Sequence, residues 1–338
     1  MMKRLILALA IAACALALPA MAQSTAEPTF TGFVEQARQL GRLETLIVAR
    51  DGKVLVEQGF GGNSTTRPTN IKSASKSVMS ALVGIAIDKG VLEGPDQAIA
   101  GFFPRDLPTD PDPRIDKVTI GNLLSMQAGL GRMSGPNYGQ WVASRNWVRA
   151  ALAAPFDGEP GGSMLYSTAS THLLSAILTR ATGRSTLELA NDWLGGVDGF
   201  RISGWERDPQ GIYLGGNQMA MTPRSLLAFG ELYRNRGMAE GKRVVSEKWI
   251  DASWTPLTRS VFSGEQYGYN WFIRNIEGHM TYYAWGYGGQ MLYITPDLGL
   301  TVVMTSQEEA SARDGYRDEL HRLMTSIVIE TARSSDQG

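Results

Sequence analysis

The chain has 338 residues and a nearly balanced charge, with 32 Lys and Arg against 33 Asp and Glu. After the first residues it has no basic run, so neither nucleic acid nor an anionic membrane surface is expected as a partner. Its single cysteine, Cys14, excludes an internal disulfide, and the length suffices for one large domain or two smaller, interleaved ones.

The first residues have the layout of a signal peptide. A basic start and an apolar run are followed by the small-residue cleavage site Ala20-Met21-Ala22. Cleavage there removes residues 1–22 and predicts a periplasmic or secreted protein with no permanent membrane span. The segment Ile11–Cys14 leaves an alternative open, a lipoprotein with its lipid on Cys14.

A helix and a β-hairpin are predicted next. Thr29–Gly41 has apolar residues at helical spacing, and β-rich runs follow at Leu46–Arg50 and Val54–Val56. The Asp51-Gly52 pair between these runs predicts a tight turn with positive φ at both positions.

The middle of the chain is predicted to be mostly helical. Ser73–Lys89 is apolar almost all round, which predicts a helix buried between two layers. Phe103–Asp116 is rich in Pro and Asp and is predicted to be a surface loop. Helical spacing recurs in five further segments: Ile120–Met126, Trp141–Ala154, Ser170–Ala181, Thr186–Leu194 and Pro223–Arg236.

Three further strands are predicted at Tyr282–Gly288, Gln290–Ile294 and Leu300–Thr305, before a closing helix at Arg313–Arg333. Strands at both chain ends with helices between them predict an α/β fold of the α+β type. Its antiparallel sheet has five or more strands, is flanked by helices, and draws on residues 30–70 and 266–335. Residues 71–265 form an inserted helical region. We expect residues 23–338 to be a single unit with its ligand site between the two regions.

The stretch Ser73-Ala74-Ser75-Lys76 starts the apolar helix and carries the first candidate chemistry. Residues at i and i+3 share a helix face, so Lys76 can lie beside the Ser73 hydroxyl and take its proton. Free N–H groups at the helix start would favour an oxyanion. By itself the pattern also fits a helix cap followed by an exposed lysine.

Two later segments could complete such a site. Tyr166 directly precedes a helix, so it is either a half-buried ring or a proton relay in a cleft. As a relay it would need a nearby cation, such as Lys76, to lower its pKa. Ala284–Gln290 concentrates glycines at a strand end, which indicates a ligand close to the backbone or an ordinary hairpin turn.

Other catalytic routes lack their motifs. The sequence has no G-x-S-x-G, no H-E-x-x-H and no phosphate-binding glycine loop. His172, His279 and His321 have no metal-ligand spacing and are expected to be structural or exposed. We therefore expect neither a metal nor a cofactor.

Together these segments resemble the serine β-lactamase and penicillin-binding-protein superfamily. That superfamily carries S-x-x-K, then Y-x-N or a similar motif, then K-T-G or H-x-G. Ser73–Lys76, Tyr166–Thr168 and Ala284–Gly286 follow in the same order. The resemblance covers about residues 30–330. It is greatest toward the branch with class C β-lactamases, family VIII-type esterases, D-aminopeptidases and 6-aminohexanoate-dimer hydrolases.

The resemblance implies a serine hydrolase that forms an acyl-enzyme on Ser73. Lys76 and Tyr166 would be the general base and acid, in an order that the sequence leaves open. The backbone N–H groups of Ser73 and Tyr287 would form the oxyanion hole. Thr168, Trp285 and Gly286 would contact a small ester or amide substrate, while Trp285 could equally pack beneath the sheet.

The chain departs from the superfamily pattern at two positions. Thr168 stands where many relatives have Asn, and Ala284 stands where they have Lys or His, which removes an expected contact with a substrate carboxylate. We therefore expect β-lactams and cell-wall material to be poorer substrates than a neutral or differently charged ester or amide. A β-lactamase or D-amino-acid-specific peptidase and a catalytically silent binding protein stay open as alternatives. Specificity is expected to come from loops such as Gly131–Gln140 and Trp205–Gly215, and the oligomeric state is left open.

Overall fold

The structure is a computed structural model that describes residues 31–308 and 315–335. The predicted signal peptide (residues 1–22), Cys14 and the predicted start of the closing helix at Arg313 lie outside these residues. Within the described ranges no helix is both long and apolar enough to span a membrane.

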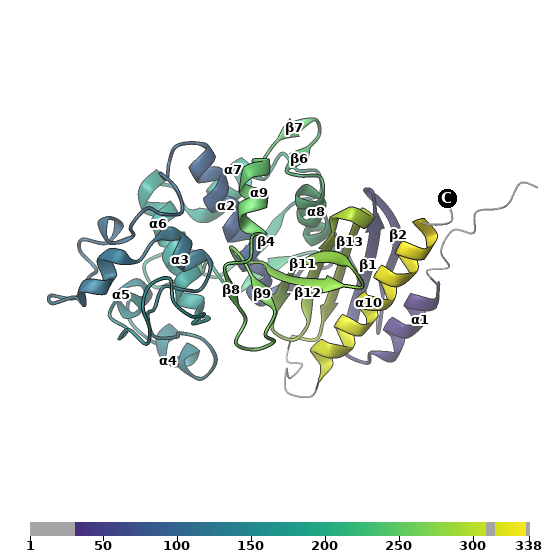
Figure 1. Cartoon of the computed structure of the whole chain (residues 1–338), viewed down its shortest axis with the longest axis horizontal. Coiled ribbons are helices and arrows are strands. Elements are labelled where there is room, and N and C mark those ends of the chain that lie inside the picture. The colour runs from purple at the N-terminus through teal and green to yellow at the C-terminus, as the bar shows by residue number, and fades with distance from the viewer. Residues whose placement is uncertain (1–30, 309–314, 336–338) are drawn as a thin grey trace, which may run out of the picture.

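An antiparallel sheet built from both chain ends organises the fold, as the sequence predicts (Figure 1). Over the described residues it has eight strands. Their spatial order is β2 (Lys53–Gly59), β1 (Leu43–Arg50), β13 (Leu300–Ser306), β12 (Gln290–Thr295), β11 (His279–Gly286), β10 (Phe272–Ile276), β9 (Gln266–Tyr267) and β8 (Thr258–Arg259). Strand β1 therefore pairs with its hairpin neighbour β2 on one side and with β13, from the other chain end, on the other.

The predicted turns between strands are confirmed. Asp51 and Gly52 join β1 to β2 with φ values of 49° and 81°, the left-handed conformation that this tight hairpin requires. Between β12 and β13 a 3-10 turn, η5 (Pro296–Leu298), ends at Gly299 with a φ of 63°.

Alternating side chains of the sheet enter two different apolar clusters. Leu46 and Val48 of β1 pack in a cluster with α1 (Thr31–Gln39) and α10 (Tyr316–Ser335), which cover one face of the sheet (Figure 1). Ile47, between them in sequence, joins the cluster that also contains residues of α2 (Ser75–Asp88) and α8 (Pro223–Arg234). The period of two in a strand thus links the sheet to the helical region through one of its faces.

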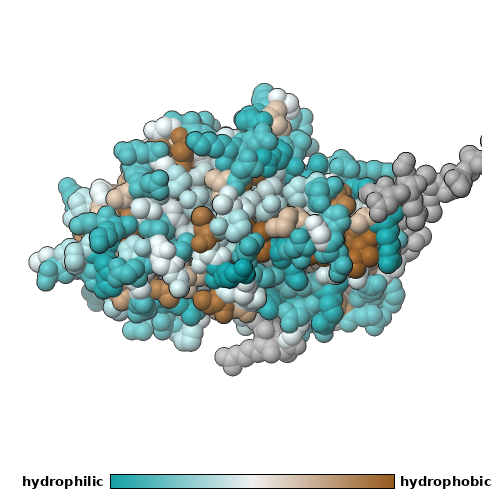
Figure 2. Space-filling view, in the orientation of Figure 1, coloured by the Kyte–Doolittle hydropathy of each residue, from teal (hydrophilic) through white to brown (hydrophobic). Residues whose placement is uncertain are grey.

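The inserted region is mostly helical, as expected. Besides α2 and α8 it contains α3 (Ile120–Leu124), α4 (Tyr138–Val142), α5 (Trp147–Leu152), α6 (Thr168–Thr182), α7 (Thr186–Trp193) and α9 (Glu247–Ser253), and the 3-10 turns η1 (Lys72–Ala74), η2 (Ala100–Phe102), η3 (Pro113–Lys117) and η4 (Gly135–Asn137). Its short strands are β3 (Thr69–Asn70), β4 (Ile202–Trp205), β5 (Met219–Met221), β6 (Met238–Ala239) and β7 (Lys242–Arg243). The face of the molecule shown in Figure 2 is mainly hydrophilic, with small, separate apolar patches.

One helix prediction is wrong. Residues 141–154 do not form one helix but belong to α4 and α5, with a break between Val142 and Trp147. The Asn146 side chain caps α5 by accepting a hydrogen bond from the Arg149 N–H. Across the break, the indole N–H of Trp141 donates to the Trp147 carbonyl at 2.9 Å. The cap and this indole bond stabilise the interruption.

Candidate active site

Ser73 lies in η1, which directly precedes α2 and contacts strands β11 and β12 of the sheet. Its neighbour Lys72 has a φ of 49°, an uncommon conformation for a residue with a side chain. Lys76 follows in the first turn of α2, and its Nζ donates to Ser73 Oγ over 2.9 Å. The i, i+3 spacing thus brings the amine and the hydroxyl into contact.

Lys76 is only 1% exposed although it is a lysine. Its Nζ also donates to the carbonyl oxygen of Gly216 at 2.5 Å. Burial lowers the pKa of Lys76 to about 7, because the charged ammonium form loses its hydration. A substantial fraction of Lys76 is therefore a neutral amine, able to accept a proton, at neutral pH.

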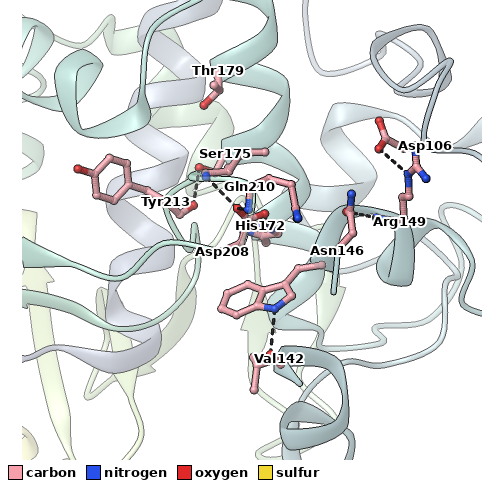
Figure 3. A network of polar contacts seen from close by, with 12 residues as sticks. Asp106, Val142, Asn146, Arg149, His172, Ser175, Thr179, Asp208, Gln210 and Tyr213 are labelled. Carbon is pink, nitrogen blue, oxygen red and sulfur yellow. Dashed lines mark hydrogen bonds and ion pairs between the residues drawn. The ribbon is translucent and has the colours of Figure 1, made fainter. Parts of the chain in front are cut away.

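The Gly216 carbonyl belongs to a loop that is held by a buried polar network (Figure 3). The backbone N–H groups of Gln210 and Ile212 donate to Asp208 Oδ1, and His172 Nε2 lies 3.1 Å from Asp208 Oδ2. Ser175 of α6 donates to the Tyr213 carbonyl at 2.7 Å. His172 is thus structural, as expected, and the network fixes the loop that ends at the acceptor of Lys76.

Tyr166 lies close to both Ser73 and Lys76. Its ring centroid lies 5.1 Å from Lys76 Nζ. Burial raises the pKa of Tyr166 to about 12, while a side-chain hydrogen bond with Ser73 acts in the opposite direction. The expectation that Lys76 lowers this pKa is wrong, because Lys76 itself loses its charge near pH 7. Tyr166 is a neutral phenol at neutral pH.

The backbone at the end of β11 approaches the chain just before Ser73. A Cβ at Gly286 would overlap the carbonyl oxygen of Ile71, so only glycine fits there without a shift. The pairing of β11 with β12 ends at Gly286 and Gln290, and the Tyr287 N–H lies beyond this last pair. The glycine-rich segment therefore combines a hairpin turn with a close backbone approach.

The two departures from the superfamily motifs have specific local surroundings. The Thr168 hydroxyl lies 3.0 Å from the Ser134 hydroxyl. The hydrogen bond that Lys76 Nζ donates besides the one to Ser73 goes to the carbonyl oxygen of Gly216. Ala284 is buried in the core cluster shared with α2. Trp285 is half-buried: it lines the cavity and contacts Phe272, with 5.8 Å between ring centroids.

A cavity of about 380 Å³ opens in front of Ser73. Its wall includes four aromatic side chains besides Tyr166, together with Arg132 and Asn217. Sequence reasoning missed Arg132, Asn217 and one of the aromatic residues, Phe262. Only the placement of Arg132 within the loop Gly131–Gln140 gave a signal for it. The full lining is Ser73, Arg132, Ser134, Gly135, Tyr138, Tyr166, Thr168, Asn217, Phe262, Trp285 and Tyr287.

The titratable side chains elsewhere do not form a metal centre. Across the described ranges, no three His, Cys, Asp or Glu side chains are grouped so that they could hold a metal ion. His279 lies beside Asp297, and His321 lies 3.0 Å from the Tyr293 hydroxyl.

Comparisons with known proteins agree on the fold. The sequence model of the family described as beta-lactamase matches residues 29–325. The 6-aminohexanoate-dimer hydrolase of Paenarthrobacter ureafaciens is 23% identical over 335 residues, covering 90% of this chain and 81% of that protein.

Two solved structures have the same fold at low sequence identity. One, from Bacillus anthracis and provisionally named a 6-aminohexanoate-dimer hydrolase, has a TM-score of 0.73 at 19% identity and covers 90% of this chain and 82% of its own. The other, EstCE1, described as a hydrolase with promiscuous acyltransferase activity, has a TM-score of 0.70 at 18% identity and covers 87% of this chain and 97% of its own.

Proposed function

The chain belongs to the beta-lactamase family, and from this membership we propose that it is an exported serine hydrolase that cleaves a small ester or amide. The observation that carries the proposal is the contact between Ser73 Oγ and Lys76 Nζ, at 2.9 Å, behind the wall of a cavity that Ser73 lines. A serine needs a neighbouring base to become a nucleophile, and a lysine with a pKa of about 7 can be that base.

In the proposed acylation, neutral Lys76 takes the proton of Ser73, and Oγ forms a bond to the substrate carbonyl carbon. The electron pair of the C=O bond moves to oxygen, where the backbone N–H groups of Ser73 and Tyr287 donate to it. The electron pair on the oxygen then re-forms the C=O bond, and the bond to the leaving group breaks with its own pair going to the leaving oxygen or nitrogen. The leaving oxygen or nitrogen takes a proton from the Tyr166 hydroxyl, and the Lys76 ammonium restores that proton.

Deacylation repeats the sequence with water in place of Ser73. Water loses a proton to the Lys76 and Tyr166 pair and adds to the acyl carbon. The carbonyl re-forms as Ser73 Oγ leaves and recovers its proton. Each residue returns to its starting state, so no cofactor enters the balance.

The choice of an ester or amide rests on the family and on the names of its members. The Paenarthrobacter ureafaciens relative is named a 6-aminohexanoate-dimer hydrolase, and EstCE1 is described as a hydrolase with promiscuous acyltransferase activity. We propose export from the layout of residues 1–22. N-terminal sequencing of the exported protein tests this, and we expect the first residue to be Gln23.

The test compares the unaltered protein with Ser73→Ala on a panel of esters and amides and on a fluorophosphonate probe. We expect Ser73→Ala to lose both turnover and labelling, because no other hydroxyl contacts Lys76 among the described residues. Ser75→Ala is the matched control in the same turn, since the Ser75 hydroxyl donates to the Lys72 carbonyl instead. Equal labelling of the unaltered protein and Ser73→Ala would exclude Ser73 as the nucleophile.

A further inference from the structure

We propose that the substrate carries a carboxylate and that Arg132 binds it. This proposal rests on the proposed function, because it names the substrate class of the same cleft. Its basis is a cationic side chain in the wall of an otherwise uncharged, largely aromatic cavity.

The segment that carries Arg132 is fastened to the segment that carries Tyr166. Arg132 Nε donates to the Tyr166 carbonyl at 3.3 Å, and the Met133 N–H donates to Ser167 Oγ at 3.0 Å. The Thr168 N–H donates to Ser134 Oγ at 2.8 Å. Three consecutive residues of one segment thus bond to three of the other, which fixes Arg132 relative to the catalytic tyrosine.

The guanidinium group is also held by stacking. Its Cζ lies 5.6 Å from the ring centroid of Phe262, and this ring meets the Tyr166 ring edge-on, with 5.6 Å between centroids. Nε is used by the Tyr166 carbonyl, which leaves the two terminal nitrogens as the side chain's remaining donors. Such a pair matches the two oxygens of a carboxylate.

The charge of Arg132 has no counterpart in its surroundings. Of the described residues that line the cavity, Arg132 alone is permanently charged and none is acidic. No ion pair joins Arg132 to a carboxylate in the part of the chain that the structure describes. A cation beside aromatic walls and without an acidic neighbour favours an anionic ligand, because the surrounding wall screens the attraction less than water does.

The proposed role of Arg132 changes what the alanine at position 284 implies about the substrate. The superfamily's third-motif cation is missing from β11, but the loop after α3 supplies a cation from another side of the cavity. The expected loss of a carboxylate contact is therefore replaced by a contact at a different position. The substrates we propose have an apolar body against Phe262, Trp285 and Tyr287 and a terminal carboxylate at Arg132.

The first experiment compares two 4-nitrophenyl esters, one with a free carboxylate and one with that carboxylate masked by a methyl group: mono(4-nitrophenyl) adipate and its methyl ester. A second pair, 4-carboxyphenyl butyrate and its methyl ester, places the carboxylate on the leaving group. We expect the unaltered protein to prefer the acid in at least one pair by about 10- to 100-fold in kcat/KM, the range of one charge-assisted contact. Arg132→Met should abolish that preference, and Arg132→Lys should restore part of it.

The control separates a substrate contact from support of Tyr166. Because Arg132 Nε donates to the Tyr166 carbonyl, a structural role would lower kcat/KM equally for acid and methyl ester, and this outcome would overturn the proposal. A preference of the unaltered protein for the methyl ester in both pairs would also overturn it. Arg201→Met, at an exposed arginine that does not line the cavity, should leave the preference unchanged.

The second experiment reads binding without turnover. Adipic acid monoanilide and its methyl ester are titrated by calorimetry into Ser73→Ala and into Ser73→Ala/Arg132→Met. Tighter binding of the acid by about tenfold or more, lost in the double variant, supports the proposal, whereas equal or undetectable binding of the acid overturns it. Because this readout needs no catalysis, it stands even if Ser73→Ala retains turnover and the proposed function fails.

Discussion

Lys76 determines how the proposed reaction responds to pH. It is buried, its two hydrogen-bond partners are the Ser73 hydroxyl and the Gly216 carbonyl, and its pKa is about 7. Tyr166 titrates at about 12, so it keeps its proton wherever Lys76 loses one. We therefore propose a division of the roles that the sequence left open, in which Lys76 accepts the first proton and Tyr166 donates one to the leaving group.

The corresponding prediction is that kcat/KM decreases only on the acid side of its pH profile. Below the pKa of Lys76 the amine is protonated and cannot accept, so kcat/KM should rise about tenfold per pH unit up to about pH 7 and then level off. Stopped-flow acylation with a neutral ester between pH 5 and 9 measures this, and the apparent value belongs to the coupled pair. A profile that stays flat down to pH 5 would contradict Lys76 as the base.

Gly286 gives a second prediction at this scale. In Gly286→Ala the new Cβ would overlap the Ile71 carbonyl, so β11 must shift and take the Tyr287 N–H with it. Loss of one oxyanion donor typically costs about 10²- to 10³-fold in kcat, and we expect that range here. Single-turnover kinetics measures the loss.

The matched control for Gly286→Ala is Gly204→Ala, in strand β4. A Cβ at Gly204 would meet only Ala220 Cβ, at 3.8 Å, which is an ordinary contact. It should therefore leave kcat unchanged. A kcat for Gly286→Ala within threefold of the unaltered protein would exclude the proposed oxyanion hole.

Single residues could be predicted from sequence where a motif fixed their spacing. Ser73 and Lys76 are three residues apart on one turn, so their contact follows from helix geometry. Gly216 could not be found in this way, because its contribution is a backbone carbonyl brought from 140 residues away by a folded loop. Arg132 was hidden for a similar reason, since only tertiary contacts place it against Tyr166.

Among the elements, α2 packs closely against α9 at a glycine, Gly84. Gly84 lies against the indole of Trp249 on α9, and a Cβ at Gly84 would overlap that ring. Gly84→Ala should therefore lower the free energy of unfolding by about 1–3 kcal/mol, the usual cost of overpacking. Urea unfolding measures this difference.

A double variant identifies the cause of that loss. Trp249→Leu should make the Gly84→Ala change much less destabilising, so the two effects should couple rather than add. Gly139→Ala, at an exposed helical glycine of α4 with nothing within 4 Å of its new Cβ, should be neutral or slightly stabilising. Equal losses for Gly84→Ala and Gly139→Ala would refute the packing explanation.

At the scale of elements, prediction succeeded where periodicity was strong and failed where it was short. The hairpin at Asp51 and the long helices follow from local sequence alone. Strands β8 and β9 have two residues each, too few for an alternating pattern. Strand β10 has five residues and lies between β11 and β9 in the sheet. The break between α4 and α5 depends on indole hydrogen bonds that no periodicity reveals.

At the scale of the whole molecule, one of the two apolar clusters contains residues of both the sheet and the helical region. Ile47 of β1 and Leu292 of β12 are in the same cluster as Leu82 of α2 and Phe229 of α8. We infer from this shared cluster that the described part of the predicted unit 23–338, residues 31–308 and 315–335, folds as a single unit. The sequence predicted the pairing of the chain ends, because neither end has enough strands to bury its own apolar face. The strand order could not be predicted, since it depends on which edges remain free after the helices have packed.

The backbone acceptor of Lys76 also affects how this scaffold could be diversified. A carbonyl oxygen stays in place whatever side chain its residue carries, so orientation of the base does not depend on the chemical nature of position 168. Thr168 can then be randomised to change substrate preference, while Ser134 is kept because its Oγ accepts from the Thr168 backbone N–H whatever side chain position 168 carries. In a directed-evolution library, selectivity and catalytic competence would thus be separable traits.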